Sequence, residues 1–270
     1  MYEFHYERPA DLSAARRLLD DHPEAKLLAG GMTLVPSLKM RLSAPSHLLD
    51  ISRLPELSDV ALAAHGLSIG AAVTHARIAR DAAIGKAVPA LAAMAGCIGD
   101  PQVRARGTIG GALANNDPAA DYPAALLAIG ERLRTDRREI AVDDFLQGMF
   151  TTALQDDEIL CAVEFRIPQR AAYAKFAHPA SGYAMTGVMV AQFDDGVRVG
   201  VTGAAPCAFR WQAAEQALDA DFSEHALAGL TLPADGLNED LHAPAVYRAH
   251  LVSVMARRAV AACIAGRASA

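Results

Sequence analysis

The chain has 270 residues, of which 52% are hydrophobic and 21% charged, enough apolar material for two domains or one large one. Its net charge of −6, without a cluster of Lys and Arg, argues against nucleic acid as the main partner. The first residues lack the pattern of a signal peptide, and no apolar run of about 18 residues is present to form a transmembrane segment. We therefore expect a cytoplasmic protein.

Short helices and strands are predicted through the first two thirds of the chain. Apolar residues at helical spacing, with a Thr cap at 74, predict helices over 11–20, from 74 through 78, over 89–95 and over 143–149. Compact apolar runs predict strands over 25–29, 47–51, 67–73 and 158–167. The shift to small polar residues after Pro55 is typical of a subdomain boundary.

The pattern changes beyond about residue 170. Residues 183–193 and 197–203, joined by Asp194-Asp195-Gly196, predict a β-hairpin. Residues 244–266 predict an amphipathic helix, and 232–242 a surface loop. Because helices and strands mix without strict alternation, we predict an α+β fold.

A glycine-rich stretch over 98–121 dominates the middle of the chain. Gly110 and Gly111 can take positive φ and offer consecutive free amides, the arrangement of an anion-binding nest. This favours a phosphate-binding loop, although a tight surface turn would have the same composition. The loop is predicted to enter a helix over 122–129, with Asp121 as N-cap and Gly130 after its end.

A second glycine pair strengthens the phosphate interpretation. Gly30 and Gly31 follow a short apolar run and precede Thr33, whose hydroxyl can donate to a phosphate oxygen. Two such loops in one chain suit a diphosphate that is held from both sides.

These two motifs resemble one known family. The sequence Ala-Gly-Gly-Met-Thr-Leu at 29–34, with Thr-Ile-Gly-Gly at 108–111 and Asp-Pro-Ala-Ala-Asp at 117–121, is similar to the FAD-binding medium subunit of molybdenum hydroxylases. These enzymes form the aerobic carbon monoxide dehydrogenase and xanthine dehydrogenase family, and the similarity extends over nearly the whole chain. It implies a PCMH-type FAD-binding domain over 1–170, with subdomains of about 1–57 and 58–170, and a C-terminal domain over 171–270 of antiparallel sheet plus helices.

The resemblance also implies a function. It implies an oxidoreductase subunit that binds FAD, takes electrons from a [2Fe-2S] subunit and passes them to an external acceptor. Molybdopterin and the clusters are expected only on partners, a large molybdenum subunit and a small iron–sulfur subunit, with two copies of each chain in a heterohexamer. Two alternatives remain open: a self-contained FAD-dependent oxidase or dehydrogenase, and a nucleotide-binding module without a redox role.

The resemblance assigns a set of residues to FAD and none to catalysis or metal binding. The cofactor-binding residues are Leu28, Ala29, Gly30, Gly31, Met32, Thr33, Leu34, Val103, Gly107, Thr108, Ile109, Gly110, Gly111, Ala114, Asn115, Asp117, Asp121, Leu160, Lys175 and Tyr183. The four cysteines, Cys97, Cys161, Cys207 and Cys263, are scattered without a metal-binding spacing, and we interpret them as small buried hydrophobic residues.

Several of these residues also have an ordinary structural interpretation. Asp121 is expected to contact the cofactor, to cap the following helix, or to do both. The resemblance places Lys175 near the pyrimidine edge of the flavin and Tyr183 against its ring, whereas a strand lysine and a half-buried tyrosine are the plain alternatives. Leu160 packs on the ring or only in the core. Asn115 and Asn116 bind the cofactor or stabilise a turn.

The sequence departs from the family pattern at two positions. Met32 and Ala112 stand where many relatives carry polar residues, which removes possible side-chain contacts there. The backbone of both motifs is unaffected by these changes.

Overall fold

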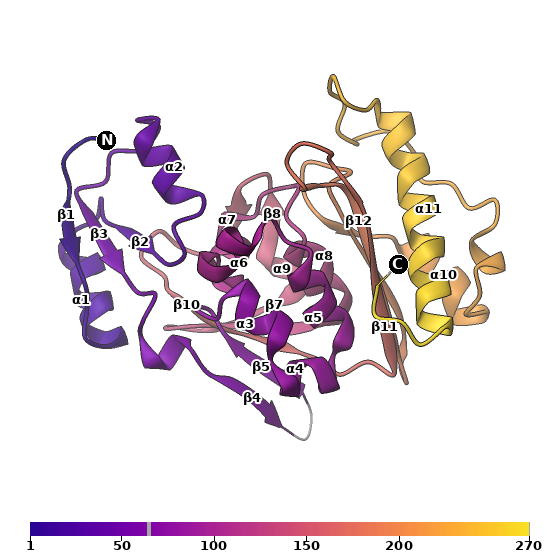
Figure 1. Ribbon diagram of the computed structural model, residues 1–270, viewed down its shortest axis with the longest axis horizontal. Helices are drawn as coiled ribbons and strands as arrows, with labels where there is room; N and C mark the ends of the chain where they lie inside the picture. The colour runs from indigo at the N-terminus through magenta and orange to yellow at the C-terminus, as the bar shows by residue number, and fades with distance from the viewer. Residues whose placement is uncertain (64–65, 270) are drawn as a thin grey trace.

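Three β-sheets of three to five strands follow one another along the long axis of the molecule (Figure 1). The structure is a computed structural model that describes residues 1–63 and 66–269. Helices and largely antiparallel strands are mixed without strict alternation, and the fold is α+β, as predicted.

The N-terminal sheet is parallel. Its strands lie in the order β1 (His5–Glu7), β3 (His47–Asp50) and β2 (Lys26–Leu28). The connections between the strands contain α1 (Leu12–Asp21) and α2 (Leu34–Lys39), because parallel neighbours need a crossover. Asp11 caps α1 by accepting a hydrogen bond from the Ala14 amide at 2.7 Å. The first glycine loop is the connection between β2 and α2.

The central sheet is antiparallel and has β10 at its centre. Its order is β4 (Val60–Ala63), β5 (Gly66–Gly70), β10 (Leu160–Phe165), β6 (Gly130–Thr135) and β7 (Glu139–Ala141). The chain between β5 and β6 forms six helices: α3 (His75–Arg80), α4 (Ala82–Ala87), α5 (Pro89–Gly96), α6 (Pro101–Arg106), α7 (Ile109–Asn115) and α8 (Tyr122–Ile129). Shorter elements are η1 (Pro55–Leu57), α9 (Val142–Phe145), β8 (Leu146–Gly148) and β9 (Thr151–Thr152).

Helix α8 is buried along its whole length. It shares one hydrophobic core with the central sheet, and β13 (Gly196–Thr202), a strand of the C-terminal sheet, packs closely against it. A Cβ atom on Gly200 of that strand would lie 2.1 Å from the Ala124 carbonyl oxygen, so only glycine fits there. A helix covered on every side needs no polar face, which explains its continuous apolar sequence.

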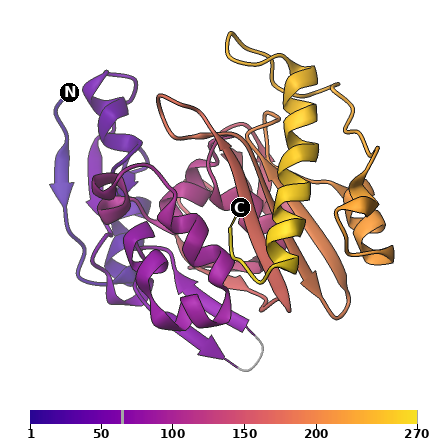
Figure 2. The ribbon, with the colours of Figure 1, turned by 45° about the vertical axis from the view of Figure 1, so that its right-hand side comes forward.

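The third sheet is antiparallel, in the order β11 (Arg170–Ala177), β12 (Ala184–Phe193), β13 (Gly196–Thr202) and β14 (Phe209–Arg210). The helices that follow this sheet in the chain are α10 (Gln212–Ala220), η2 (His225–Leu227) and α11 (Ala245–Ile264). The long helix α11 lies along β11 and β12, on the side of the sheet away from the central helices (Figure 2). A second hydrophobic core fills the space between this sheet and its two helices.

Most of the predicted elements are confirmed. The helices over 11–20, 74–78 and 89–95, the strands over 25–29, 47–51, 67–73 and 158–167, the hairpin and the C-terminal helix all have counterparts within a few residues. The division of the chain near residues 57 and 170 stays a prediction.

The expectation of a continuous loop over 98–121 is wrong, because this stretch contains α6 and α7. Asp100 accepts a hydrogen bond from the Val103 amide at 2.8 Å, and Thr108 accepts one from the Gly111 amide at 3.1 Å. These two caps start short helices, and in α7 the cap acts in spite of the low helix propensity of two glycines.

The helix predicted over 143–149 is also only partly present. α9 ends at Phe145, and the chain continues as β8, in which Leu146 pairs with Thr152 of β9. Pairing with a neighbouring strand thus replaces the last turns of the predicted helix.

Candidate functional site

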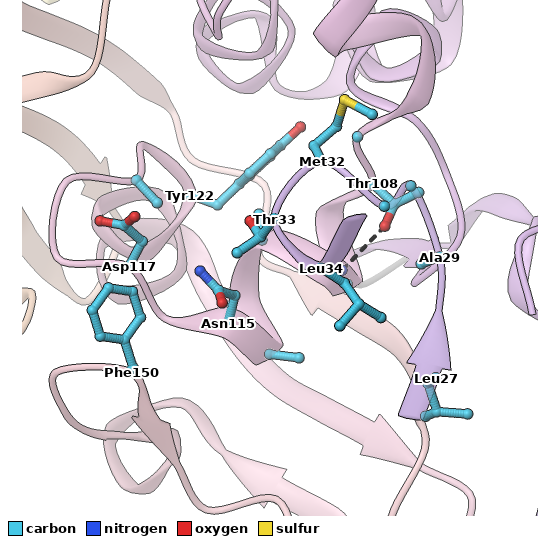
Figure 3. Close-up of a pocket in the computed structure, with 18 of the residues that line it drawn as sticks. Leu27, Ala29, Met32, Thr33, Leu34, Thr108, Asn115, Asp117, Tyr122 and Phe150 are labelled. Carbon is cyan, nitrogen blue, oxygen red and sulfur yellow. Dashed lines mark hydrogen bonds between the residues drawn. The ribbon is translucent and has the colours of Figure 1, made fainter. Parts of the chain in front are cut away.

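A cavity of about 1120 Å³ lies between the N-terminal sheet and the helices of the central unit, and extends to the loop between β11 and β12 of the third sheet. Figure 3 shows part of its lining, with Thr33 and Leu34 from one side and Thr108, Asn115 and Tyr122 from the other. Its volume is at the upper end of the range typical of small-molecule sites. Both glycine motifs line it.

The first glycine loop presents free backbone amides to the cavity. Gly31 has φ +74°, a conformation that favours glycine, and in the described part of the chain no amide from residues 29 to 34 donates a hydrogen bond to another protein group. Gly30 is buried against the second motif, where an added Cβ atom would lie 2.3 Å from the Arg106 carbonyl oxygen. The loop therefore combines a fixed position with available donors, which suits an anion.

The backbone of the second motif does not form the anion-binding nest that its sequence predicts. Gly110 and Gly111 have no positive φ and lie in the first turn of α7. The Gly110 amide donates to the Ala71 carbonyl at 2.9 Å, and the Gly111 amide to the Thr108 hydroxyl oxygen. Because both amides already have acceptors, the prediction of a nest at this motif is wrong. Glycine is needed for space instead: an added Cβ on Gly110 would lie 2.5 Å from that of Ala71.

Asp121 is buried and lies at the cavity wall, at the start of α8. Its carboxylate accepts a hydrogen bond from the Tyr173 hydroxyl at 2.6 Å and pairs with the Lys175 ammonium at 3.0 Å. Asp121 occupies the predicted N-cap position of α8, but in the described residues its carboxylate makes no capping bond. Burial raises the pKa of Asp121, while Lys175 and Tyr173 oppose that rise.

Lys175 supports the wall of the cavity from behind. Besides the bond to Asp121, its ammonium donates to the carbonyl oxygens of Cys97 at 3.2 Å and Gly182 at 3.1 Å. Its side chain is 9% exposed and is not part of the cavity lining. It thus links α5, α8 and the loop that carries Tyr183.

Apolar and aromatic side chains line other parts of the cavity wall. Leu160 is buried at the start of β10, and Tyr183 is half exposed next to Gly182, which has φ +72°. Phe150 is 57% exposed between β8 and β9. Burial raises the pKa of the Tyr183 hydroxyl, so this side chain is neutral near pH 7. Such a set suits a planar aromatic ligand.

The two asparagines have different roles. Asn115 lines the cavity, whereas Asn116 is buried and has φ +43° at the end of α7. The Asn116 side-chain amide donates to the carbonyl oxygens of Gly148 at 2.8 Å and Thr151 at 2.9 Å. Asn116 therefore holds the segment that carries Phe150 and has a structural role.

The predicted site residues largely converge on this one cavity. All of them line it except three, which are Leu28, Ile109 and Lys175. Ile109 is fully buried in the core below the second motif, and Leu28 belongs to β2. Met32 and Ala112, the two departures from the family pattern, both border the cavity.

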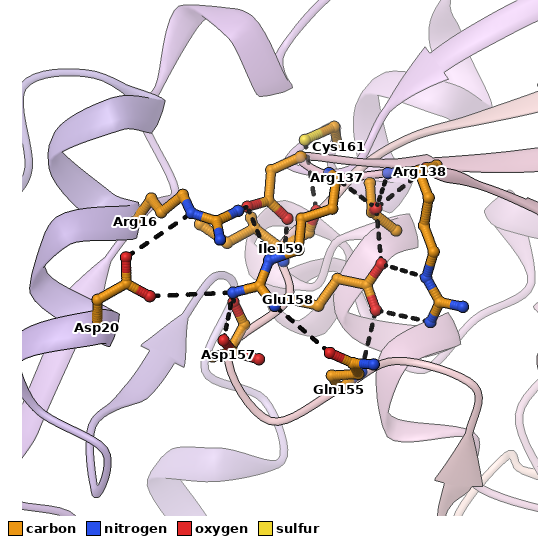
Figure 4. A network of polar contacts seen from close by, with 11 residues as sticks. Arg16, Asp20, Arg137, Arg138, Gln155, Asp157, Glu158, Ile159 and Cys161 are labelled. Carbon is orange, nitrogen blue, oxygen red and sulfur yellow. Dashed lines mark hydrogen bonds and ion pairs between the residues drawn. The ribbon is translucent and has the colours of Figure 1, made fainter.

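A polar cluster joins the N-terminal unit to the central sheet (Figure 4). Arg16 of α1 pairs with the buried Asp136 at 2.5 Å, and Asp136 also accepts a hydrogen bond from the Ile159 amide at 2.8 Å. Next to them, Glu158 accepts a bidentate pair of hydrogen bonds from Arg138 at 2.9 Å each. These bonds lower the pKa of Glu158 to about 2. The cluster fixes the unit that carries the first glycine loop.

The cysteines and acidic residues of the chain are not arranged as metal ligands. Among residues 1–63 and 66–269, no group of three or more His, Cys, Asp or Glu side chains is placed to hold a metal ion, and no helix is long and apolar enough to cross a membrane. Cys161 and Cys263 are buried as predicted, but Cys97 is exposed, because it follows the last residue of α5 at the surface.

The family described as "FAD binding domain in molybdopterin dehydrogenase" matches residues 2–170. The chain belongs to this family. It is 34% identical over 272 residues to the nicotine 6-hydroxylase medium subunit of Paenarthrobacter nicotinovorans, with 94% of this chain and 95% of the relative covered. It is 32% identical over 276 residues to the carbon monoxide dehydrogenase medium chain of Hydrogenophaga pseudoflava, covering 95% and 96%.

A solved structure shows the same fold. A chain of carbon monoxide dehydrogenase from Hydrogenophaga pseudoflava, in a form that lacks the Mo-pyranopterin moiety, superposes with a TM-score of 0.88 at 32% identity, covering 97% of this chain and 98% of that one. The chain is thus an FAD-binding medium subunit of the molybdenum hydroxylase family and an oxidoreductase component.

The cavity fits FAD by its own features. It combines the free amides of the first loop for a diphosphate, an apolar and aromatic end for a ring system, and buried polar atoms that lack a protein partner. Those atoms are the Tyr122 hydroxyl and His75 Nδ1, in the residues that the structure describes. A polar ligand would complete their hydrogen bonding.

Among the lining residues that sequence reasoning missed, three carry rings: Tyr122, His75 and Phe150. The sequence pattern assigns Tyr122 only to an apolar helix, and His75 only to the helix after Thr74. Phe150 follows Met149 in a segment with no periodic pattern. A polar atom inside an otherwise apolar helix is the available signal for Tyr122, whereas nothing in the sequence marks Phe150.

Proposed function

We propose that this chain holds FAD in the cavity and serves as the electron-transfer subunit of a molybdenum hydroxylase complex. Electrons enter from a [2Fe-2S] subunit and leave to an external acceptor. The observation that carries the proposal is the convergence of both glycine motifs, Asp121, Leu160 and Tyr183 on one elongated cavity.

Different residues of this chain would bind different parts of the cofactor. The amides of residues 29 to 34 donate to the diphosphate, and Gly111 leaves room for it next to Ala29. Asp121 offers its carboxylate to hydroxyl groups, and Leu160 and Tyr183 enclose the isoalloxazine. When bound, FAD supplies one-electron and two-electron redox chemistry, so it can link an iron–sulfur cluster to a two-electron acceptor.

The role of Lys175 is indirect in this proposal. Its charge is paired with Asp121, so it orients that carboxylate and fixes Gly182, next to Tyr183. We propose that this contact sets the position of Tyr183 at the ring and thereby tunes the reduction potential of the bound flavin.

The proposed partners are a large molybdenum subunit and a small iron–sulfur subunit, two copies of each, in a cytoplasmic heterohexamer. Support comes from the relatives, which are named as medium subunits or chains and match this chain over almost their full length. The interface with the iron–sulfur subunit should lie near the exposed part of the flavin, because electrons have to cross a short gap.

Reconstitution tests the proposal. The purified chain alone should bind FAD with one equivalent per chain but should oxidise no N-heterocycle, aldehyde or carbon monoxide. Expressed with its molybdenum and iron–sulfur subunits, it should form a stable complex in which substrate reduces the flavin. A chain that oxidises such a substrate by itself would instead be a self-contained oxidase, and a chain that binds no flavin would refute the proposal.

A further inference from the structure

Two buried polar side chains lie together in the wall of the cavity without a protein partner. Tyr122 is 1% exposed and His75 is 5% exposed, and their ring centroids are 5.2 Å apart. Within residues 1–63 and 66–269, neither the Tyr122 hydroxyl nor His75 Nδ1 forms a hydrogen bond. Leaving such atoms unpaired costs free energy, so a native structure usually supplies a partner. Both residues line the cavity, which is where that partner can come from.

The backbone fixes where this pair lies. The His75 amide donates to the Gly107 carbonyl at 2.9 Å, and an added Cβ on Gly107 would lie 2.6 Å from His75 Nε2. Tyr122 follows Asp121 in the first turn of α8. His75 therefore contacts Gly107, the residue against which Gly30 of the first motif packs. Tyr122 is next to Asp121 in the chain.

Figure 3 shows Tyr122 among the lining side chains, with its hydroxyl pointing away from Asp117 and into the region that Met32 and Thr33 border. Tyr122 belongs both to the hydrophobic core around α8 and to the cavity lining, so its side chain lies at the boundary between them. The residue lines the cavity, while its hydroxyl oxygen is buried in the wall of the ligand-free protein.

Both groups are uncharged near neutral pH. Burial raises the pKa of Tyr122 well above its ordinary value. Burial, together with the nearby charge of Arg104, lowers the pKa of His75 to about 4. A neutral phenol and a neutral imidazole each donate and accept hydrogen bonds, which matches hydroxyl groups better than a phosphate anion.

We propose that Tyr122 and His75 form an uncharged polar subsite that hydrogen-bonds the ribityl hydroxyls of FAD. This inference rests on the proposed FAD binding. The ribityl chain joins the diphosphate to the ring, and the subsite lines the same cavity as the amides that suit the diphosphate and the side chains that suit the ring. The ligand hydroxyls replace the water that these two groups lose on folding.

A role in ligand binding and a purely structural role predict different effects on the stability of the apoprotein and on its affinity for FAD. Removing an unpaired buried hydroxyl leaves the apoprotein equally stable or makes it more stable, whereas the complex loses a hydrogen bond. Tyr122→Phe should therefore leave the thermal midpoint of the flavin-free chain unchanged or raised. It should weaken FAD binding by about tenfold. His75→Leu, which also removes the ring nitrogens, should weaken binding in the same direction.

Tyr173→Phe is the matched control. It removes a buried hydroxyl that does have a partner, Asp121, at 2.6 Å. We expect it to lower the midpoint of the flavin-free chain, because the buried Asp121 carboxylate loses a donor. The two Tyr-to-Phe changes should thus have opposite effects on the apoprotein.

The deciding experiment measures FAD affinity of the full-length apoprotein by flavin fluorescence, with FMN and ADP as competitors. FMN contains the ribityl chain and ADP does not, so Tyr122→Phe should weaken FMN about as much as FAD and leave ADP unchanged. Equal FAD affinity in Tyr122→Phe and wild type would overturn the subsite, and so would an equal loss for ADP. Wild-type protein that binds no FAD would refute the proposed function itself, which separates the two failures.

Discussion

Gly30 packs so closely on Arg106 that an added Cβ atom would lie 2.3 Å from the Arg106 carbonyl oxygen. This contact joins the first glycine loop to the end of α6, just before the second motif. The two motifs thus come together through a backbone contact, and residues of both motifs line the cavity there. Glycine at 30 serves the fold, whereas glycine at 111 faces the cavity and serves the ligand.

Gly111→Val should abolish FAD retention while the chain still folds. The added Cβ would lie 3.0 Å from the Thr108 hydroxyl oxygen and 4.0 Å from the Ala29 Cβ, and the valine methyl groups would fill space meant for the cofactor. The variant should therefore lose FAD because valine occupies part of the cavity, and not because the φ of residue 111 is forbidden to valine. Flavin content after purification and the thermal midpoint of the apoprotein are the measurements.

Gly85→Val is the control for Gly111→Val. Gly85 also lies in a short helix, α4, and an added Cβ there would meet no described atom within 4 Å. It should retain flavin at the wild-type level. Stoichiometric FAD in Gly111→Val would show that the second motif does not border the cofactor.

Lys175→Met should destabilise the protein, because it leaves the Asp121 carboxylate buried without its cation. Loss of one partner of a buried pair costs about 3 kcal/mol. The double variant Lys175→Met with Asp121→Asn removes both charges and should regain part of that loss. Urea unfolding of the flavin-free chain measures the free energy of unfolding of each variant. Equal stability of the single variant and wild type would mean that this ion pair does not form.

The same lysine should affect the redox properties of bound flavin, together with Tyr183. Lys175→Met and Tyr183→Ala should both keep FAD, since the diphosphate contacts remain, but change its reduction potential or its rate of reoxidation. Potentiometry and stopped-flow reoxidation test this. Wild-type values in both variants would make the two residues purely structural.

Arg16→Met should weaken FAD binding from a distance. Arg16 does not line the cavity, but its bond to Asp136 holds α1 and hence the first glycine loop against the central sheet. The loss of stability should be about 1 kcal/mol, since the Arg16 side chain is partly exposed. Arg17→Met, at an exposed position of the same helix, should change neither quantity. FAD affinity equal in both variants would show that the polar cluster does not position the loop.

The stability of the apoprotein should fall as pH falls from about 6.5 to about 4. In this window His75 takes up a proton in the unfolded chain but not in the folded one, since burial lowers its folded pKa to about 4. The unfolded state then binds more protons, so acid favours unfolding. The His75 contribution is about 3 kcal/mol across the window. His75→Leu should flatten this part of a plot of unfolding free energy against pH, and an unchanged slope would contradict the burial of a neutral His75.

The sequence predicted the helices and strands with strong periodicity and the location of the site, but not how each motif works. The prediction located α8 from Pro123, an apolar run and Gly130, and the structure has it at those bounds. Capping by Thr108 made a helix of the second motif, and this effect of one side chain outweighed two glycines.

Tertiary contacts decided the remaining differences. Asp121 was predicted to cap α8, but Tyr173 and Lys175, more than 50 residues later in the chain, take its carboxylate instead. Likewise, nothing local indicates that Phe150 borders the cavity, because its place depends on hydrogen bonds from Asn116. Such contacts between distant segments have no signature in a single sequence.

We propose above all that flavin on this chain receives its electrons from a partner, and anaerobic rapid mixing of the assembled complex with its substrate tests this most directly. We predict that the flavin absorbance bleaches in the complex and that the flavin of the isolated chain stays oxidised with the same substrate. Bleaching in the isolated chain, or a complex in which the iron–sulfur centres become reduced while the flavin stays oxidised, would contradict the proposal.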